Sequence, residues 1–314
     1  MSGLAPGTPI GPYRVLEPLG LGAMGEVYRV TDGVGRQLAL KLLRGRMDGA
    51  RLERFAREGE VAAGLRHSGI VQVHATGVAD QGPYLVYELV EGEDLERAWR
   101  RLDRDQLLEI TLHVAQALGH AHAQGVVHRD VKPANVLLDG RGRARLADFG
   151  LAQAVGLERL TQSGAVLGTP HYMAPEQAAG QRTRYGPPTD VWALGVLLYR
   201  ALTGRLPFSG PDLMTLAARI ASVEPPPPRQ LDPTLSPGLE AVCLRALHKD
   251  PDRRYADRRV PRARPGAGAA GAPSKRKARR GRGPRVAGAL GLLALLGAGA
   301  WAVVASRPAR RPSS

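Results

Sequence analysis

The first residues whose types and spacing suggest chemistry are Gly20, Gly22 and Gly25, which form a G-x-G-x-x-G pattern near the start of the chain. This spacing alone also occurs in dinucleotide-binding folds and in ordinary turns. The residues that follow separate these cases, because 27–30 and 37–43 are strand-like runs joined by the turn sequence TDGVGR. A dinucleotide-binding fold would require a helix at this point. The pattern therefore predicts a glycine-rich hairpin whose backbone amides close over phosphates without obstruction by side chains.

The second strand of this hairpin carries Lys41 in the apolar sequence LALKLL. A cation in such a setting is costly to bury unless it meets a phosphate and a carboxylate. Arginine predominates among the basic residues before position 261, and the three lysines there are Lys41, Lys132 and Lys249. A planar guanidinium does not replace a compact ammonium at a crowded phosphate. The composition therefore supports a special role for Lys41 and Lys132.

Three further motifs follow in order: HRDVKPAN at 128–135, DFG at 148–150 and GTPHYMAPE at 168–176. Several ordered motifs at such separations are far more specific than any one of them. With the glycine-rich hairpin, they make the sequence resemble the eukaryotic-like (Hanks-type) serine/threonine protein kinases of bacteria, from about Tyr13 to Arg254. The resemblance implies a bilobal α+β protein kinase fold, with a small β-rich N-lobe and a mainly helical C-lobe. It also implies transfer of the γ-phosphate of ATP to Ser and Thr hydroxyls of proteins.

The resemblance assigns catalytic roles to residues of these motifs. Asp130 is expected to accept or orient the proton of the substrate hydroxyl, while Lys132 holds the transferring phosphoryl group. Asn135 and Asp148 are expected to supply oxygen ligands to Mg²⁺, which prefers hard oxygen donors. Lys41 would contact the α- and β-phosphates of ATP. Since tyrosine kinases place an arginine differently in this loop, Lys132 also indicates Ser and Thr acceptors.

The resemblance also implies a partner for Lys41 and a site for adenine. Glu58 is expected to pair with Lys41, because it lies nine residues before His67 on an expected helix, and Glu60 is the nearest alternative. Ala39 and Leu137 would enclose the adenine ring, and the backbone of 88–90 would hydrogen-bond its edge. The residues expected to bind the nucleotide are Gly20, Gly22, Gly25, Val27, Ala39, Lys41, Glu88, Val90 and Leu137.

Structural and regulatory residues complete the expected kinase domain. Asp190 resembles the helical residue that braces the catalytic loop, and Glu176 would pair with Arg254. Arg129, beside Asp130, suggests a pocket for a phosphate on the activation loop, and charge-assisted hydrogen bonds to such a phosphate would order that loop. Thr161 or Ser163 lies where similar bacterial kinases autophosphorylate. His128 is expected to pack under the catalytic loop rather than to catalyse.

The elements that must position these residues divide the chain into segments. Residues 11–90 show short apolar runs and one helical interval around 51–65, which predicts a small sheet with one helix. From about Asp94 to Arg258 the apolar runs lengthen to helical period, for example at 107–123 and 190–202. We expect an N-terminal segment (1–12), a kinase domain (13–258, with lobes at about 13–90 and 91–258), a basic linker (259–285), a transmembrane helix (286–305) and a short tail (306–314). Because the basic sequence follows so closely on Arg254, the final helix of similar kinase domains is expected to be missing or very short.

Charge is distributed unevenly between these segments. The chain of 314 residues has a formal net charge of +15, but residues 261–314 hold 12 basic and no acidic residues, so the first 260 carry 32 basic and 29 acidic residues. The nearly balanced charge of the first 260 residues argues against a nucleic-acid binder. The excess basic residues lie instead beside an apolar span, where anionic lipid headgroups are the nearer partner. The single Cys243 allows no intrachain disulfide.

The apolar span, 286–305, contains 20 residues without a charge. As a helix it would be roughly 30 Å long, the thickness of the hydrocarbon core of a bilayer. Seven cations between Lys275 and Arg285 predict, by the positive-inside rule, that the kinase domain lies in the cytoplasm and the tail outside the cell membrane. Ala294, Ala298 and Ala302 form a small-residue face that can pair two such helices, which would give a homodimer able to autophosphorylate in trans.

Two functions compete on these observations. The first is a membrane-tethered serine/threonine kinase that uses ATP and Mg²⁺. The alternative is a catalytically silent pseudokinase that acts as a scaffold at the membrane. Pseudokinases commonly lose at least one of the motif residues, and Lys41, Asp130, Asn135 and Asp148 are all present. The sequence therefore favours the enzyme.

Overall fold

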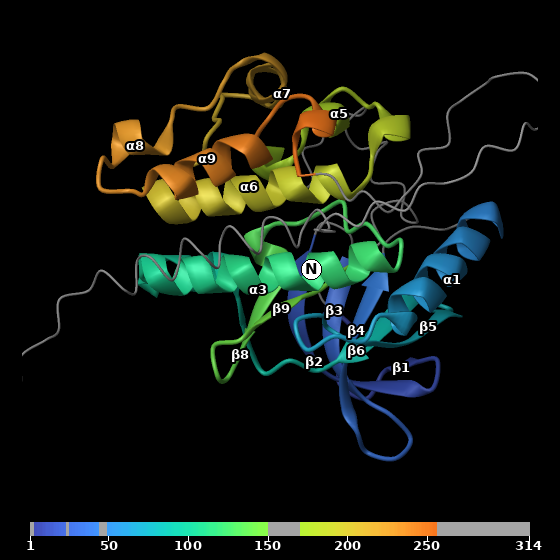
Figure 1. The fold of residues 1–314 in the computed structure, drawn as a ribbon. Coiled ribbons are helices and arrows are strands. Elements are labelled where there is room, and N and C mark those ends of the chain that lie inside the picture. The colour runs from blue at the N-terminus through green and yellow to red at the C-terminus, as the bar shows by residue number, and fades with distance from the viewer. Residues whose placement is uncertain (1–2, 23–24, 44–48, 150–169, 256–314) are drawn as a thin grey trace, which may run out of the picture.

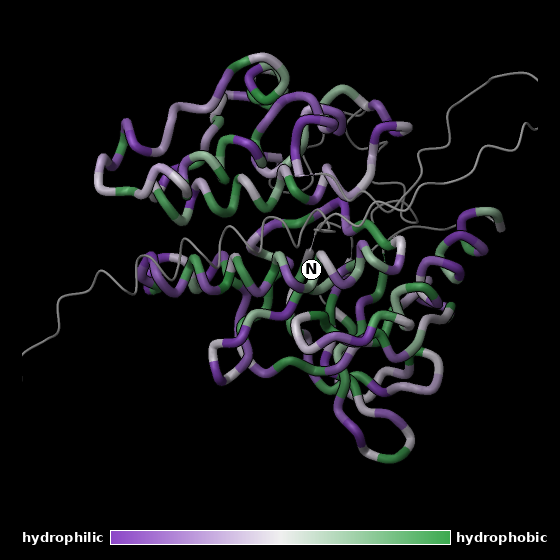
Figure 2. The backbone as a smooth tube through the Cα atoms, viewed as in Figure 1, coloured by the Kyte–Doolittle hydropathy of each residue, from purple (hydrophilic) through white to green (hydrophobic). Residues whose placement is uncertain are grey.

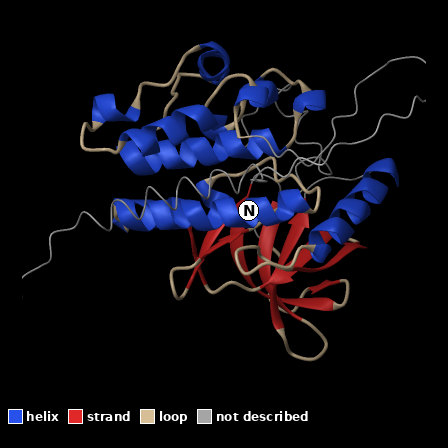
Figure 3. Ribbon diagram, viewed as in Figure 1, coloured by secondary structure: helices blue, strands red, loops and turns tan. Residues whose placement is uncertain are grey.

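A computed structural model describes residues 3–22, 25–43, 49–149 and 170–255. The strands gather in one lobe and most of the helices in the other, with the long helix α3 between them (Figures 1 and 3). This is the bilobal arrangement that the sequence predicts, a β-rich N-lobe followed by a helical C-lobe.

The N-lobe is built on a six-stranded antiparallel sheet with the strand order β1-β2-β3-β4-β6-β5. Side chains alternate between the two faces of a strand, and each face of this sheet buries its own apolar cluster. The strands are β1 (Pro9–Ile10), β2 (Tyr13–Gly22), β3 (Gly25–Thr31), β4 (Gln37–Leu43), β5 (Val73–Ala79) and β6 (Gly82–Glu88).

Helix α1 (Gly49–Gly64) covers one face of this sheet. Its buried residues Phe55, Gly59 and Ala62 recur at helical spacing and therefore form one stripe. Gly59 allows close contact with β5, because a β-carbon at this position would lie 2.2 Å from a methyl group of Thr76. The helix is held at a fixed distance from the sheet.

The C-lobe is organised around α6 (Pro187–Thr203), which lies beside α3 (Arg104–Ala123). Thirteen of the 17 residues of α6 are buried, so this helix is the centre of the lobe rather than an amphipathic surface helix. Hydrophobic stretches run along both helices in Figure 2. The other described helices are α2 (Leu95–Ala98), α5 (Pro175–Ala178), α7 (Leu213–Ser222), α8 (Pro228–Leu231) and α9 (Pro237–Ala246). The short 3₁₀ turns are η1 (Trp99–Arg101), η2 (Pro133–Asn135), η4 (Pro170–Tyr172), η5 (Arg182–Arg184) and η6 (Pro251–Arg253).

Local signals at the helix ends explain where the helices begin and end. The Asp103 side chain accepts a hydrogen bond from the amide of Gln106, and the Gln106 side chain accepts one from the amide of Asp103, which forms a capping box at the start of α3. Helix α6 begins at Pro187 and is followed by Gly204 in the left-handed conformation. The predicted helical runs at 107–123 and 190–202 both fall within these two helices.

A second sheet, of order β7-β8-β9, lies within the part of the chain for which the sequence predicts mainly helices. Its strands are β7 (Gly92–Asp94), β8 (Val136–Asp139) and β9 (Ala144–Leu146). Strands of three or four residues are too short to show an alternating pattern, which is why the sequence does not reveal them. The sheet matters for function, because β8 follows directly on η2 and fixes the end of the HRDVKPAN segment.

Several predicted segments fall outside the described residues. These are the linker at 259–285, the apolar span at 286–305, the tail at 306–314 and the expected shortening of the lobe after Arg254. In the described part of the chain, no helix combines the length and hydropathy needed to cross a membrane.

Candidate active site

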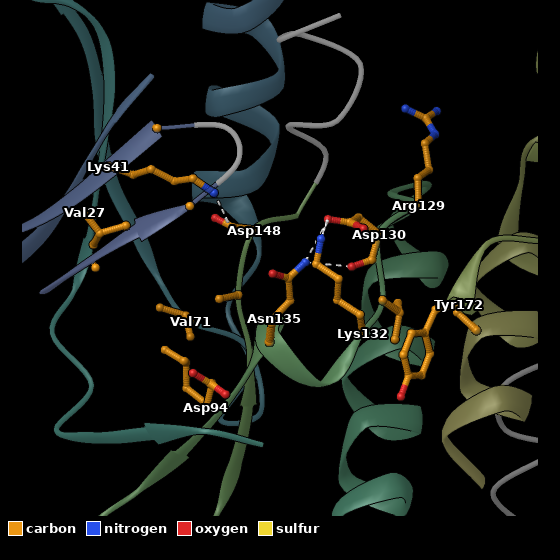
Figure 4. Close-up of a pocket in the computed structure, with 18 of the residues that line it drawn as sticks. Val27, Lys41, Val71, Asp94, Arg129, Asp130, Lys132, Asn135, Asp148 and Tyr172 are labelled. Carbon is orange, nitrogen blue, oxygen red and sulfur yellow. Dashed lines mark hydrogen bonds and ion pairs between the residues drawn. The ribbon is translucent and has the colours of Figure 1, made fainter. Parts of the chain in front are cut away.

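A cleft of about 1050 Å³ lies between the lobes. This is about the upper end of the range for pockets that bind small molecules. Its N-lobe wall comes from β2, β3, β4 and β6, and its C-lobe wall from residues 129–137 and 147–148. The motifs that lie far apart in the sequence therefore face one cavity (Figure 4).

The glycine-rich hairpin forms the roof of the cleft. In the register of β2 and β3, Gly22 lies opposite Gly25 and Gly20 opposite Val27. A β-carbon on Gly25 would lie 2.0 Å from the carbonyl oxygen of Leu42, so the strand contact itself requires this glycine. A β-carbon on Gly20 would meet no described atom within 4 Å. That glycine leaves open space on the cleft side, as the approach of a phosphate requires.

Lys41 reaches across the cleft to the DFG segment. Its side chain is 10% exposed, and its ammonium lies 2.5 Å from Oδ2 of Asp148. The Tyr87 hydroxyl donates a hydrogen bond to Oδ1 of the same carboxylate, at 3.0 Å. Burial alone would raise the pKa of Asp148, but the charge and the hydrogen bond of Lys41, with the hydrogen bond of Tyr87, hold it below its usual value. The Asp148 carboxylate is therefore ionised, and both of its oxygens are held by residues of the N-lobe.

Glu58 lies on the buried stripe of α1, because its neighbours along one helical face are Phe55 and Ala62. Its side chain is half-buried, whereas that of Glu60 is exposed. This placement favours Glu58 over Glu60 as the residue that faces the sheet. Its ion pair with Lys41 stays a prediction.

The catalytic loop brings three polar side chains together on the opposite wall. Lys132 Nζ lies 2.7 Å from Oδ2 of Asp130, and Nδ2 of Asn135 donates to the Asp130 carbonyl at 2.7 Å and to Oδ2 at 3.1 Å. Oδ1 of Asp130 accepts no hydrogen bond from the described residues. One carboxylate oxygen thus remains available to accept a proton, while the other is held in place (Figure 4).

Asp190 anchors this loop from below. Its fully buried carboxylate accepts hydrogen bonds from His122 Nε2 (2.7 Å), the amide of His128 (2.8 Å) and the amide of Arg129 (2.7 Å). Burial alone would raise the pKa of Asp190, but its hydrogen bonds and the nearby histidines lower it below its usual value. His128 is itself buried, donates to the Ala147 carbonyl and packs on a ring of the DFG segment, so its place is structural.

A residue that the sequence analysis does not single out completes the support of this loop. Gln177, in α5, donates from Nε2 to the carbonyl of Arg129 at 2.8 Å and accepts at Oε1 from the amide of Ala174. With Asp190, it holds both polar groups of the Arg129 peptide backbone. Its place as the third residue of a four-residue helix gives no local signal of this contact.

The base of the C-lobe contains the expected partners Glu176 and Arg254. Two hydrogen bonds of 2.8 Å join the guanidinium to both carboxylate oxygens, and the two side chains are 1% and 0% exposed. Thr189 adds a hydrogen bond to the same carboxylate. The pair ties α5 to the turn η6 at the end of the described chain.

The adenine side of the cleft is apolar. Val27, Ala39, Val90 and Leu137 line it from both lobes. The Glu88 amide already donates to the Gln72 carbonyl at 2.9 Å, and its side chain accepts from Arg145. The Glu88 amide is therefore not available to adenine, and the expected backbone donor to the adenine edge is the amide of Leu89 or Val90.

The cleft also fits a divalent metal ion. Both hydrogen bonds of Asn135 come from Nδ2, so its amide oxygen accepts none from the described residues and is available as a ligand beside Asp148. Mg²⁺ is commonly held by one or two protein oxygens together with substrate phosphates. The described residues contain no cluster of three or more His, Cys, Asp or Glu with the geometry of a protein-only metal site. The donor set is that of a metal bound together with a nucleotide.

Of the three residues predicted to regulate activity, the structure describes one, Arg129. The Arg129 guanidinium points away from Asp130 (Figure 4), and its buried Nε has no hydrogen-bond partner in the part of the chain that the structure describes. Thr161 and Ser163 lie outside the described residues.

A glycine-rich hairpin over a buried lysine, opposite a loop that holds an aspartate, a lysine and an asparagine, defines the catalytic domain of a phosphotransferase. The protein kinase domain model matches residues 13–262, and the chain belongs to this family.

Relatives and solved structures agree with this assignment. The chain is 41% identical over 257 residues to the probable serine/threonine-protein kinase SCO3848 of Streptomyces coelicolor, covering 78% of this chain and 38% of that protein. It is 40% identical over 256 residues to the serine/threonine-protein kinase PknA of Mycobacterium tuberculosis, covering 78% of this chain and 58% of that protein. The crystal structure of the PknI kinase domain of Mycobacterium tuberculosis matches with a TM-score of 0.64 and 33% identity, covering 81% of this chain and 94% of that chain. The chain thus spans about four to six tenths of the length of these curated relatives, and nearly all of the solved kinase domain.

Proposed function

We propose that this protein is a serine/threonine protein kinase that transfers the γ-phosphate of ATP to hydroxyls of protein substrates. The observation that carries the proposal is the ion pair that Lys41 of the N-lobe forms with Asp148 across the cleft, beside the group of Asp130, Lys132 and Asn135 in the catalytic loop. The serine/threonine kinases named above support the substrate class.

Each of these residues has a chemical task in the transfer. Oδ1 of Asp130 accepts or orients the proton of the attacking hydroxyl, while Lys132 and Asn135 keep the carboxylate in position. Lys41 binds the phosphates of the nucleotide, and Lys132 neutralises charge on the phosphoryl group as it moves. Asn135 and Asp148 would hold Mg²⁺, which supplies charge neutralisation at the phosphates.

The decisive test is phosphate transfer from labelled ATP to the protein itself and to a generic Ser/Thr substrate. Wild type is expected to transfer phosphate, and Asp130→Asn is expected to lose about 100-fold or more of the rate, because general base catalysis typically contributes 10²–10⁴-fold. Asp139→Asn is the matched control, since Asp139 is a carboxylate at the end of β8 that pairs with Arg143 and does not line the cleft. An inactive wild type, or equal rates in wild type and Asp130→Asn, would leave the pseudokinase scaffold as the better explanation.

We further propose that activation-loop phosphorylation on Thr161 or Ser163 regulates this activity. The buried Nε of Arg129, which has no hydrogen-bond partner among the described residues, supports this, because a guanidinium beside the catalytic loop offers charge-assisted hydrogen bonds to a phosphate. Mass spectrometry of the autophosphorylated protein identifies the site. Phosphate at neither position, with normal turnover, would refute the proposal.

The membrane setting is a proposal that rests on the sequence. The apolar span at 286–305 and its basic flank support a single-pass anchor in the cell membrane with the kinase domain in the cytoplasm, and the alanine face supports a homodimer. Fractionation of cells that express the full chain, followed by protease treatment of right-side-out vesicles, tests the anchor and its orientation. Recovery of the kinase in the wash, or its digestion from outside, would contradict the anchor or its direction.

A further inference from the structure

Tyr87 contributes a single polar atom to the wall of the cleft. It lies near the end of β6, is 6% exposed and packs into the apolar cluster beneath α1 with Phe55 and Val71. Its hydroxyl donates to Oδ1 of Asp148, while Lys41 takes Oδ2. Among the described residues, the carboxylate therefore has one donor on each oxygen.

The two donors come from one face of the N-lobe sheet. In the register of β4 and β6, Lys41 lies opposite Leu85 and Ala39 opposite Tyr87. Since side chains alternate along a strand, these residues share the face that is covered by α1. The sheet thus presents an ammonium and a hydroxyl from the same face to the DFG segment.

Asp148 needs such a pair because its own backbone is unusual. Its φ is 65°, a left-handed conformation that is uncommon for residues other than glycine, although aspartate, asparagine and histidine adopt it more often than the rest. Residues in such regions persist when the surrounding structure holds them there. The described contacts of the Asp148 side chain that do so are those to Lys41 and Tyr87.

The two donors differ in what they can do during the reaction. Lys41 has a long, flexible side chain that is also expected to contact the phosphates. Tyr87 has an aromatic ring fixed by packing, and burial raises the pKa of its hydroxyl, which therefore remains a donor. A carboxylate oxygen has two lone pairs, so Oδ1 can accept this hydrogen bond and still bind a metal ion.

We propose that the Tyr87 hydroxyl is a positioning group that holds the Asp148 carboxylate in the orientation needed to bind Mg²⁺ with the nucleotide. The proposal rests on the function proposed above and extends it to a residue of the N-lobe sheet. Hydrogen-bonded partners of ligating carboxylates orient the ligand, and their loss typically costs 10–100-fold in metal affinity or activity.

Tyr87→Phe removes only the hydroxyl, and Tyr84→Phe is its matched control. Tyr84 lies on the same strand and is also 6% exposed, but it belongs to the cluster on the opposite face of the sheet. Mg²⁺ is titrated at saturating ADP, and the increase in Tm over that with ADP and EDTA is recorded. We expect Tyr87→Phe to need about tenfold more Mg²⁺ than wild type to reach half of the maximal increase in Tm. The affinity for ADP in EDTA and the Tm without ligand should stay close to those of wild type.

Further outcomes separate this proposal from its alternatives. A Mg²⁺ midpoint in Tyr87→Phe equal to that of wild type, or shifted equally in Tyr84→Phe, overturns the positioning role. Tyr87→Leu removes ring and hydroxyl together, so a shift in Tyr87→Leu without one in Tyr87→Phe would show that packing is responsible. If wild type shows no Mg²⁺-dependent increase and no phosphate transfer, the proposed function itself fails. Phosphate transfer by wild type with an unchanged midpoint in Tyr87→Phe refutes the role of Tyr87 alone.

Discussion

The buried ion pair between Glu176 and Arg254 gives the most quantitative test of how this fold is held together. Arg254 uses all five of its N–H donors: two bind Glu176 at 2.8 Å, and the others bind the carbonyls of Pro188, His248 and Lys249 at 2.7–3.1 Å. Arg254→Met removes every one of these bonds. It also leaves the Glu176 carboxylate, 1% exposed, without its counter-ion.

The expected cost follows from burial rather than from the number of bonds. Removing one partner of a buried pair typically destabilises by about 3–5 kcal/mol, because the remaining charge stays buried and uncompensated. Total stabilities are about 5–15 kcal/mol, so this loss is a large share of what the domain has. For a domain of this size, about 2–4 °C of Tm accompanies each kcal/mol, and we expect a fall of about 6–20 °C.

The assay is urea-induced unfolding monitored by circular dichroism, with Arg184→Met as the control. Arg184 pairs with Asp250 at 2.9 Å in the same region, but its side chain is 42% exposed and that of Asp250 is 45% exposed. Exposed pairs contribute about 0–1 kcal/mol, so the control should change little. Arg254→Lys should not restore stability, since three donors on an ammonium cannot replace a planar group with five. Equal losses in Arg254→Met and Arg184→Met would refute the reasoning.

Two further variants test the support of the catalytic loop. Gln177→Glu keeps the acceptor for the Ala174 amide but replaces the donor to the Arg129 carbonyl. We therefore expect turnover to fall about tenfold, the effect of one hydrogen bond, with the KM for ATP unchanged. Steady-state kinetics measures both constants, and a change confined to KM would contradict this role. Asp190→Asn should show a pH-dependent loss of stability. Because the pKa of Asp190 is lowered on folding, its ionised form stabilises the fold above the usual pKa of about 3.9, and the benefit disappears as the pH falls through the lower, folded value. The Tm difference from wild type should therefore shrink below about pH 4, and a difference independent of pH would argue against this role.

The sequence was most informative where local pattern and chemistry agree. The strand predicted at 37–43 coincides with β4, and the predicted turn before it joins β3 to β4. Of the three lysines before position 261, Lys41 and Lys132 both line the cleft, while their role at a phosphate stays a prediction. The third lysine, Lys249, instead lies over the Phe208 ring and donates to the Ile220 carbonyl in the C-lobe. Residue scarcity can therefore mark a special environment without saying which kind.

The contacts that the sequence could not reveal are those between elements far apart in the chain. Tyr87 reads as an ordinary aromatic residue of a buried strand, and its contact with Asp148 joins residues 61 positions apart. Gln177 reaches 48 positions back to Arg129. Neither contact has a periodicity or a local motif, because each depends on how two elements pack.

These contacts meet at the two strained points of the site. Among the described residues other than glycine, Arg129 and Asp148 have positive φ values, 68° and 65°. Such conformations cost of order 1–3 kcal/mol each and persist only where other contacts fix them. Arg129 is held at its amide by Asp190 and at its carbonyl by Gln177, and Asp148 is held at its two oxygens by Lys41 and Tyr87. One strained residue precedes the expected base, Asp130, and the other is the expected metal ligand. The fold therefore supports the chemistry by holding two unfavourable backbone conformations from both sides, with residues that come from four separate elements.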